Sequence, residues 1–480
     1  MDDVAYRSTI ELVRALQARQ VSSRELLDAL AARIEARNPA IGAVVTLDLD
    51  RARDRADAID ADRAAGRPMG PLTGVPMTVK DSLMTEGVRT TSGAPELADF
   101  VPTVDADPVA RLKAAGAVVF GKTNLPIWAG DVQSFNDVFG PSNNPWDPGR
   151  SVGGSSGGSA AALAAGFTPL EVGSDIAGSI RNPAAMCGVV GHKPSYGVVS
   201  ARGQIPGPPG TLTQADLAVV GPMARTVDDC ELALDLLAGP DAWHDQAWSL
   251  RLPPARPGRP RVAVWSDDPY CPVDPEIRQA VEDVAGQLEA QGCLVDRQAR
   301  PDGVDFARAD AAFTALLGGA LAGAWTPGEI EDLAAAAAEG RDPKGDLGVQ
   351  GAHLRHRAWL SANERRLQMR ARWRTFFERF DVVLAPVSPT VAIPHDHSSP
   401  MSARRITVAG ASRPYTDQMR WMGLFGVSYL PVTAVPVAIH SEGLPIGIQV
   451  VGPFLEDRTA LAVARRIEEA TGGFRRPPGW

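Results

Sequence analysis

The sequence predicts an α/β fold with a largely parallel sheet. Short apolar runs, such as residues 75–79 and 117–120, have the length and composition of buried strands. Helical patterns such as residues 107–115 alternate with these runs, and this alternation is typical of parallel strands joined by helices. The 480 residues are 44% hydrophobic and 22% charged, which is ordinary globular composition and enough for a large core.

The expected elements divide the chain into consecutive parts. Residues 1–70 are predicted to be helical, because Ser22 to Glu25 is a capping-box pattern ahead of apolar residues at helical spacing. Four prolines between Pro253 and Pro260 mark a candidate boundary. The parts are 1–70, 71–240, 261–400 with a helical insertion or cap at 306–378, and 401–480. The later expected strands are 170–172, 261–265, 293–296, 381–385, 432–439 and 446–451, and the later helices are 159–165, 275–290 and 457–470.

Composition and charge argue against several classes of function. The net charge of −9 gives no support for binding to nucleic acid or to an anionic membrane. The four cysteines are scattered without a CxxC pair, so we expect neither a structural zinc site nor a disulfide framework. The N-terminus has no apolar signal segment, and the longest apolar stretch, residues 313–325, is too short to span a bilayer. We therefore expect a cytoplasmic protein.

A glycine- and serine-rich segment at residues 152–160 is the first candidate for chemistry. Its glycines allow a tight turn that leaves a serine hydroxyl unshielded, and Ser155 lies at its centre. A helix is predicted to begin just after it, so that the free N–H groups of its first turn point back at the same place. Taken alone, the segment is equally compatible with a flexible loop.

Two further residues suggest a site around Ser155. Ser179 lies in a second glycine-containing turn, residues 173–183, whose successive N–H groups can form an anion-binding nest. Lys80 directly follows the apolar run 75–79. A lysine at the end of a buried strand loses its hydration, which lowers its pKa and allows it to act as a base.

Together these segments resemble the amidase signature family of Ser–Ser–Lys hydrolases. The resemblance implies a single-domain α/β/α sandwich around a large, mixed, twisted sheet, with residues 1–480 forming one amidase domain. It also implies that no metal or cofactor is needed. The motifs that carry it follow one another across nearly the whole chain, at residues 74–81, 116–124, 153–159, 173–183, 191–194 and 443–449.

The resemblance also implies a role for each site residue. Ser155 is expected to be the nucleophile, with Ser179 bridging it by hydrogen bonds to the neutral base Lys80. The acyl-enzyme formed in this way is then hydrolysed by water. The oxyanion is expected to be held by the backbone N–H groups of Ile176, Ala177, Gly178 and Ser179.

Three residues are expected to support this site. Ser156 is the neighbour of the proposed nucleophile, and Asp175 and Arg181 are expected to form an ion pair that holds the second turn. Ala177 stands where the family most often has glycine. If that position required a positive φ, alanine would cost on the order of 1 kcal/mol.

Three motifs point to other chemistry. Residues 116–123 fit the phosphate-binding pattern GxxxxGK[ST], but the intervening Ala-Val-Val-Phe favours a strand, which cannot wrap a phosphate. Gly153-x-Ser155-x-Gly157 fits the nucleophile elbow of α/β-hydrolases, but residues 141–150 cannot form the strand that an elbow requires. The run 395–397 (His-Asp-His) is a weak metal-site pattern that is more often simply solvated.

Several apolar side chains are candidates for a substrate pocket. They can equally be ordinary core residues, because aromatic and methionine side chains fill cores as well as pockets. The candidates are Trp128, Gln133, Phe135, Met419 and Trp421, and their neighbours Phe139, Trp146, Met422 and Phe425 share the ambiguity.

Three functions follow from the resemblance. The first is a stand-alone amidase, acting on aryl acylamides, other small amides, esters or carbamates, as a monomer or homodimer without nucleic-acid or membrane partners. The second is the glutaminase A subunit of a tRNA-dependent amidotransferase, although this chain lacks the usual Asn-Leu-Ala-Gly-Leu-Pro pattern and has residues 425–431 in its place. The third is a binding protein that has lost catalysis, which the intact serines and lysine disfavour.

Overall fold

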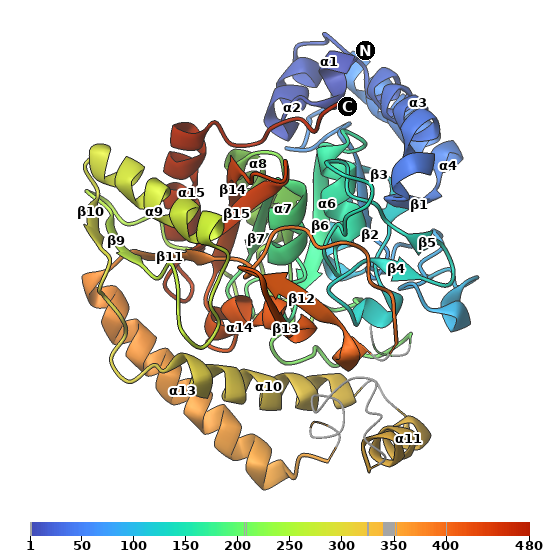
Figure 1. Ribbon diagram of the computed structural model, residues 1–480. Coiled ribbons are helices and arrows are strands. Elements are labelled where there is room, and N and C mark those ends of the chain that lie inside the picture. Colours follow the sequence, from blue (N-terminus) through green and yellow to red (C-terminus); the bar gives the residue numbers. More distant parts are fainter. Residues whose placement is uncertain are drawn as a thin grey trace.

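The central sheet takes its strands from both halves of the chain. The computed structural model describes residues 2–205, 207, 209–323, 326–338, 351, 353–399 and 401–480. Within these residues, eight strands pair in the order β10-β9-β11-β15-β14-β7-β8-β6 (Figure 1). Their bounds are β6 Leu170–Asp175, β7 Val190–Lys193, β8 Val219–Ala224, β9 Arg261–Val264, β10 Leu294–Asp296, β11 Val382–Pro386, β14 Val432–Ile439 and β15 Pro445–Val451.

This sheet is mixed, whereas the alternation of helices and strands predicted a largely parallel one. Strand β9 is parallel to β10 and β11, but the other neighbouring pairs of the sheet are antiparallel. Strands β14 and β15 are joined by residues 440–444, and so short a connection permits only antiparallel pairing. A buried strand reads as the same apolar run in either direction, so the sequence pattern could not reveal this.

A smaller sheet places Lys80 beside the large one. Its strands pair in the order β1-β3-β2, with β2 parallel to β3 and β1 antiparallel to it. Strand β2 lies against β6 of the large sheet. The bounds are β1 Val44–Leu47, β2 Pro76–Lys80 and β3 Val118–Thr123, and two short hairpins consist of β4 Phe135–Asn136 with β5 Gly140–Pro141, and β12 Arg405–Val408 with β13 Ala411–Pro414.

Helices cover both faces of the large sheet, which confirms the predicted α/β/α sandwich. In β9, Val262 and Val264 pack into the apolar cluster that contains α8, α9 and α15. The intervening Ala263 packs into the cluster that contains α10, α13 and α14, because successive side chains of a strand point to opposite faces. These helices are α8 Val227–Leu237, α9 Pro275–Ala290, α15 Asp457–Thr471, α10 Phe306–Ala322, α13 His356–Arg379 and α14 Arg420–Gly426.

Helices α3, α4 and α6 pack on the smaller sheet, whereas α11 lies away from that sheet (Figure 1). The two predicted capping-box residues, Ser22 and Glu25, bond reciprocally at the start of α3. The bounds are α1 Asp2–Ala5, α2 Thr9–Gln17, α3 Ser23–Ile41, α4 Leu49–Ala64, α5 Asp107–Ala114, α6 Gly157–Ala164, α7 Arg181–Cys187 and α11 Pro327–Ala338. Residues 339–350 of the expected insertion 306–378 lie outside the described residues.

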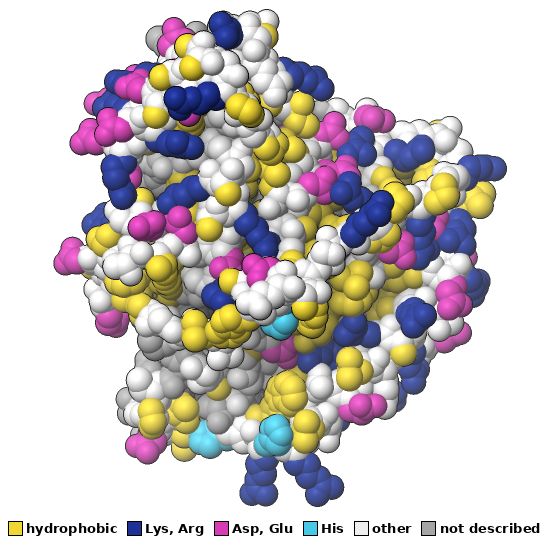
Figure 2. Space-filling view, turned by 180° about the vertical axis from the view of Figure 1, so that it is seen from behind, with side chains coloured by type: hydrophobic (Ala, Val, Ile, Leu, Met, Phe, Trp, Pro, Cys, Tyr) yellow, Lys and Arg dark blue, Asp and Glu magenta, His cyan; other side chains and the backbone are white. Residues whose placement is uncertain are grey.

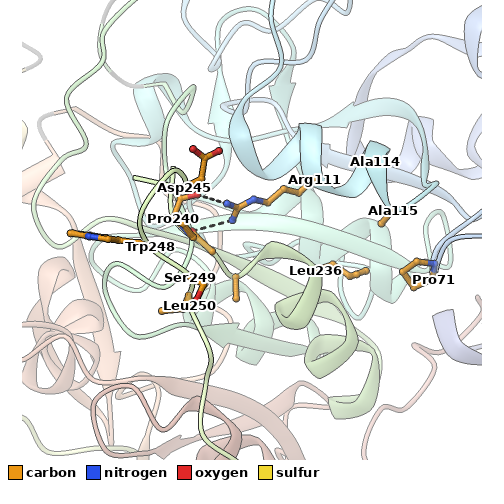
Figure 3. Close-up of a pocket in the computed structure, with 12 residues that line it drawn as sticks. Pro71, Arg111, Ala114, Ala115, Leu236, Pro240, Asp245, Trp248, Ser249 and Leu250 are labelled. Atoms are coloured by element: carbon orange, nitrogen blue, oxygen red, sulfur yellow. Dashed lines mark hydrogen bonds between the residues drawn. The ribbon is translucent and has the colours of Figure 1, made fainter. Parts of the chain in front are cut away.

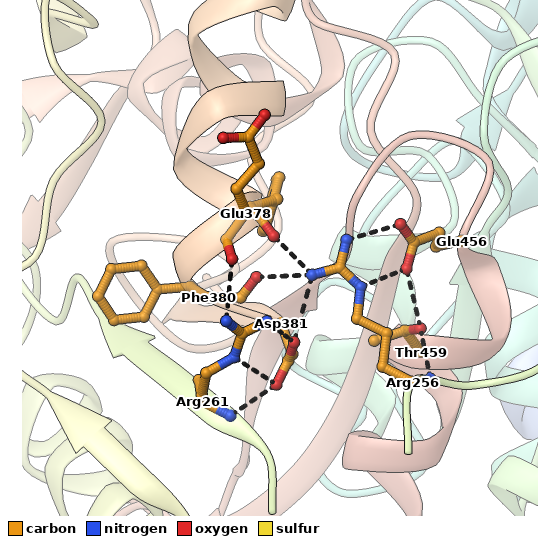
Figure 4. Close-up of polar contacts among 8 residues, drawn as sticks. Arg256, Arg261, Glu378, Phe380, Asp381, Glu456 and Thr459 are labelled. Atoms are coloured by element: carbon orange, nitrogen blue, oxygen red, sulfur yellow. Dashed lines mark hydrogen bonds and ion pairs between the residues drawn. The ribbon is translucent and has the colours of Figure 1, made fainter. Parts of the chain in front are cut away.

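The proline-rich segment 253–260 is fastened to the rest of the molecule. Arg256 donates hydrogen bonds to the backbone carbonyl of Phe380 (3.0 Å) and to both carboxylate oxygens of Glu456 (2.6 Å each). Asp381 accepts further bonds from Arg256 and Arg261, so the segment is tied to the C-terminal end of α13 and the start of α15 (Figure 4).

The surface carries charges of both signs. Figure 2 shows Lys and Arg side chains interspersed with Asp and Glu side chains on the face turned to the viewer. Of the helices in the described part of the chain, none combines the length and apolar character needed to cross a membrane.

Candidate active site

Lys80 stands at the end of β2 with its amine enclosed by hydroxyl groups. Its Nζ donates hydrogen bonds to Ser155 Oγ at 2.6 Å and to Ser174 Oγ at 3.0 Å. The side chain is fully buried, and this burial lowers the pKa of Lys80 to about 7, against the opposing charge of Asp175. Burial therefore favours the uncharged form of the amine beside Ser155.

The loop that carries Ser155 is held from two sides. Ser134 Oγ donates to the carbonyl of Gly153 (3.0 Å) and accepts the N–H of Gly157 (3.1 Å). A Cβ on Gly154 would lie 2.7 Å from the carbonyl oxygen of Asp131, so glycine is required where the loop passes this backbone. The Gly154–Ser155 peptide bond is cis.

Ser156 ties the same loop to β6. Its Oγ accepts the N–H of Ser174 and donates to the carbonyl of that residue, both at 3.3 Å. The N–H of Ser156 donates to the carbonyl of Ser179 at 3.0 Å, which brings the two glycine-containing turns together. Three segments that are far apart in the sequence therefore meet around Lys80.

A buried ion pair shapes the second turn. Arg181 donates to both carboxylate oxygens of Asp175, from Nε at 3.0 Å and from Nη2 at 2.9 Å, and both side chains are fully buried. Burial alone would raise the pKa of Asp175, but the charge and hydrogen bonds of Arg181 outweigh it and lower that pKa to about 2. The expected ion pair is thus present, and it fixes the turn that contains Ser179.

The same carboxylate changes the expected oxyanion site. Gly178 donates its N–H to Asp175 Oδ1 at 2.8 Å, so this N–H is already used. Among the described residues, no acceptor lies within reach of the N–H groups of Ile176, Ala177 and Ser179. Three of the four predicted donors therefore remain available to an oxyanion.

The glycine that the turn needs is Gly178, and Ala177 does not require a positive φ. Gly178 has φ +113°, and a Cβ there would lie 2.2 Å from the sulfur of Met422. Ala177 has no positive φ, so alanine causes no strain at this position.

The order of the two serines differs from the expected one. Lys80 contacts Ser155 directly, whereas Ser179 was expected to stand between them. Within the described chain, the Ser179 hydroxyl has no hydrogen-bond partner of its own, and Ser179 is 7% exposed where Ser155 is 1% exposed. The lysine and Ser155 thus lie at the inner end of the site and Ser179 at its outer end.

Two of the five predicted pocket residues have structural roles. Trp421 is fully buried, donates from Nε1 to the carbonyl of Cys271 at 2.9 Å and packs edge-on to Trp265. The amide of Gln133 is occupied by the backbone of Asp396 and the hydroxyl of Tyr415. The other three, which keep part of their surface exposed, are Trp128, Phe135 and Met419.

Ser174 and Ser134 were not predicted as site residues. Ser174 is one of the two hydroxyls that contact the Lys80 amine. It immediately precedes Asp175 in β6, and its position before the second turn was the only signal in the sequence. Ser134 comes from a separate segment, so only the folded chain places it under the Ser155 loop.

The phosphate-loop pattern is a strand, as predicted. Residues 118–123 form β3, and Lys122 donates to the carbonyl of Leu83 and to the hydroxyls of Thr85 and Thr90 inside the protein. In the 395–397 run, His397 stacks on Phe135 with ring centroids 4.0 Å apart. No group of three or more His, Cys, Asp or Glu side chains within the described ranges is arranged to hold a metal ion.

A surface hollow of about 540 Å³ lies between α5 and the segment after α8 (Figure 3). Arg111 crosses it and donates to the carbonyls of Gly239 and Pro240. Its guanidinium is therefore used to hold the backbone that follows α8. Neither serine of the site nor Lys80 lines this hollow.

The α/β/α fold places a buried lysine among serine hydroxyls, and comparison with known proteins gives the family. A family model described as Amidase matches residues 25–461. The A subunit of glutamyl-tRNA(Gln) amidotransferase from Moorella thermoacetica is 34% identical, over 99% of this chain and 99% of that protein.

Solved structures agree with this. One, of a vestigial protein complex tied to the evolutionary origins of an s-triazine catabolic enzyme, has a TM-score of 0.83 and 30% identity, and covers 98% of this chain and 100% of that one. The structure of 6-aminohexanoate cyclic dimer hydrolase has a TM-score of 0.81 and 27% identity, over 99% of each chain. The chain belongs to the amidase signature family, whose hydrolases act on C–N bonds.

Proposed function

We propose that the protein hydrolyses a carboxamide through an acyl-enzyme on Ser179, with Ser155 relaying the proton to neutral Lys80. The observation that carries the proposal is the 2.6 Å hydrogen bond between Lys80 Nζ and Ser155 Oγ. Ser179 is the more exposed serine and lies in the turn with unused N–H groups, so a substrate carbonyl can reach it. The roles of the two serines are therefore the reverse of those expected from the sequence.

The proposed steps need the Ser179 hydroxyl, which has no partner within the described chain, to turn and donate to Ser155 Oγ. Ser179 Oγ attacks the carbonyl carbon while its proton passes to Ser155 and the proton of Ser155 passes to Lys80. The N–H groups of Ile176, Ala177 and Ser179 stabilise the oxyanion. The proton then returns through Ser155 to the leaving nitrogen, the C–N bond breaks, and water hydrolyses the acyl-enzyme by the same relay.

Covalent labelling separates the two serines. A fluorophosphonate reagent should modify wild-type protein at Ser179, located by peptide mass spectrometry, and Ser179→Ala should abolish labelling. Ser155→Ala should slow labelling on the order of 10²-fold or more, because the relay is broken, while the adduct stays on Ser179. An adduct on Ser155 would restore the order expected from the sequence, and no adduct on either serine would reject the mechanism.

An uncharged amide with an apolar acyl group is the first substrate candidate. Ala177 belongs to the buried apolar cluster that also contains Phe313, Leu316 and Leu424, and Met419 packs against it. An acyl chain on Ser179 would lie beside this cluster and gain from the removal of apolar surface from water. Hydrolysis of aliphatic and aryl amides, with Ser179→Ala as the blank, tests this candidate.

The second candidate is a glutaminase that works with partner proteins. It is favoured by the similarity to the A subunit of glutamyl-tRNA(Gln) amidotransferase, which spans nearly the full length of both proteins. These relatives support this candidate more directly than a stand-alone enzyme. Ammonia release from glutamine that rises when a co-purified partner is added would select it, and amide hydrolysis by the isolated chain without glutaminase activity would reject it.

A further inference from the structure

The backbone of residues 131–134 supports the loop that carries Ser155. A Cβ built on Gly154 would lie 2.7 Å from the carbonyl oxygen of Asp131, so the two stretches of backbone touch. The Ser134 hydroxyl donates to a carbonyl before Ser155 at 3.0 Å and accepts an N–H after it at 3.1 Å. The position of Ser155 therefore depends on where this support lies.

The side chains of the support are held by a later segment of the chain. Tyr415 donates its hydroxyl to Asp131 Oδ1 at 2.6 Å, and Arg404 donates from Nη1 to Asp131 Oδ2 at 2.6 Å. Gln133 donates to the Tyr415 hydroxyl at 3.0 Å and to a backbone carbonyl nearby at 2.7 Å. Among the described residues, every hydrogen-bond partner that the Asp131 and Gln133 side chains have outside the support lies within residues 396–415.

Tyr415 is itself held in place on several sides. It is 2% exposed, and its ring packs in an apolar cluster with Val132 and Ile406. Its backbone N–H donates to the carbonyl of Arg404 at 3.2 Å, and the Arg404 guanidinium lies 5.3 Å from the ring centre. A hydroxyl that donates to a carboxylate forms a short, charge-assisted bond, and the bond to Asp131 has that length.

The segment that begins at Tyr415 also reaches the turn of the second serine. Tyr415 opens a short 3₁₀ helix, Tyr415–Met419, which continues directly into α14. In α14 the sulfur of Met422 lies against Gly178. The Met422 carbonyl accepts a hydrogen bond at 2.8 Å from the arginine of the buried ion pair. One continuous segment therefore contacts the support at one end and the Ser179 turn at the other.

We propose that Tyr415 is a positioning residue for the proton relay between Ser155 and Ser179. Through Asp131 it fixes the loop that carries Ser155, and through the helix that follows it sets this loop against the turn of Ser179. This inference rests on the proposed function and concerns the same two serines. The Ser179 hydroxyl has to reach Ser155 Oγ, and a shift of about 1 Å between reacting groups can cost on the order of 10²-fold in rate.

The test measures how fast a fluorophosphonate reagent labels Ser179. Tyr415→Phe removes the hydroxyl and keeps the ring, and it should lower the labelling rate on the order of tenfold. Ser155→Ala breaks the relay itself. In that background Tyr415→Phe should change the rate by less than about twofold, because no aligned relay is left to disturb. A merely structural role would lower the rate by the same factor in both backgrounds.

Tyr429→Phe is the matched control. The Tyr429 hydroxyl also donates to a carboxylate that an arginine binds, because Asp216 accepts from both Tyr429 and Arg366. Within the described chain, none of these three side chains has a hydrogen bond to either serine turn. Tyr429→Phe should therefore leave the labelling rate of Ser179 nearly unchanged.

A second pair of variants decides if Tyr415→Phe fails to fold, which circular dichroism detects. Asp131→Asn keeps an oxygen that can accept the Tyr415 hydroxyl, and Asp131→Ala removes it. Both lose the charge that faces Arg404, so they differ in the bond to Tyr415. The labelling rate should fall further for Asp131→Ala than for Asp131→Asn.

The opposite outcomes overturn the inference. They are an unchanged rate in Tyr415→Phe, a tenfold loss that persists in the Ser155→Ala background, an equal loss in Tyr429→Phe, or equal rates in the two Asp131 variants. In each case wild-type protein still labels at Ser179 and the proposed function stands. Absent labelling of Ser179 in the wild type rejects the proposed function itself.

Discussion

Lys80 and Lys122 lie one register step apart on neighbouring parallel strands and face opposite sides of the small sheet. Lys80 pairs with Thr123 and Val79 pairs with Lys122 across β2 and β3, so the two lysine side chains point away from each other. Both are fully buried, and burial lowers the pKa of Lys80 to about 7 and that of Lys122 to about 8. Neither burial nor the lowered pKa distinguishes the two lysines.

Their partners do distinguish them. Among the described residues, the amine of Lys80 donates hydrogen bonds to two serine hydroxyls, and the neighbouring turn carries Ser179, which is 7% exposed. The amine of Lys122 contacts the carbonyl of Leu83, which has no proton to give, and two buried threonines. A lowered pKa therefore identifies a candidate base only when its neighbours can pass a proton to a substrate.

The largest effect should separate the two lysines directly. Lys80→Met should lower kcat/KM for an amide substrate on the order of 10²–10⁴-fold, because it removes the base. Lys122→Met should change turnover per folded molecule only a few-fold, since Lys122 takes no part in the relay. Initial rates normalised to folded protein measure both variants. Equal losses in kcat/KM would mean that Lys80 has no catalytic role that Lys122 lacks.

The pH dependence should sharpen the comparison. Lys80 acts when it is uncharged, and protons bind it increasingly as the pH falls below its pKa of about 7. We expect kcat/KM to fall about tenfold for each unit of pH below that value and to level off above it. A neutral anilide, which does not titrate itself, is the suitable substrate, and a profile that stays flat from pH 5 to 9 would count against the base.

The smallest expected effect is on the free energy of unfolding, and it should be larger for Lys122→Met than for Lys80→Met. Lys122→Met removes the donor that reaches the Thr85 and Thr90 hydroxyls and one of the two donors to the Leu83 carbonyl, which should cost about 1–3 kcal/mol. Lys80→Met removes a buried amine whose serine partners can rotate, so its cost should be smaller. Urea unfolding followed by circular dichroism compares the two, and a larger loss for Lys80→Met would reverse this assignment.

Much of the fold could be predicted from local patterns. The expected helix 275–290 matches α9, and the expected strand 432–439 matches β14, because caps, prolines and apolar periodicity act over a few residues. The strand directions of the large sheet could not be predicted, since a run buried on both faces has no polar side to orient it. Trp421 could not be distinguished from a pocket residue by sequence, because aromatic side chains fill cores as well as pockets. The structure shows that it is fully buried.

By itself, the sequence determined the chemical inventory of the site: a lysine at the end of a buried strand, two serines in glycine-rich turns, and an acid and an arginine able to pair. Only the tertiary structure decided which serine touches the lysine and which N–H groups of the second turn remain unused. Hydrogen bonds depend on distances of a few tenths of an ångström between groups that are tens or hundreds of residues apart. Such distances are set by packing across the whole core, which no local pattern contains.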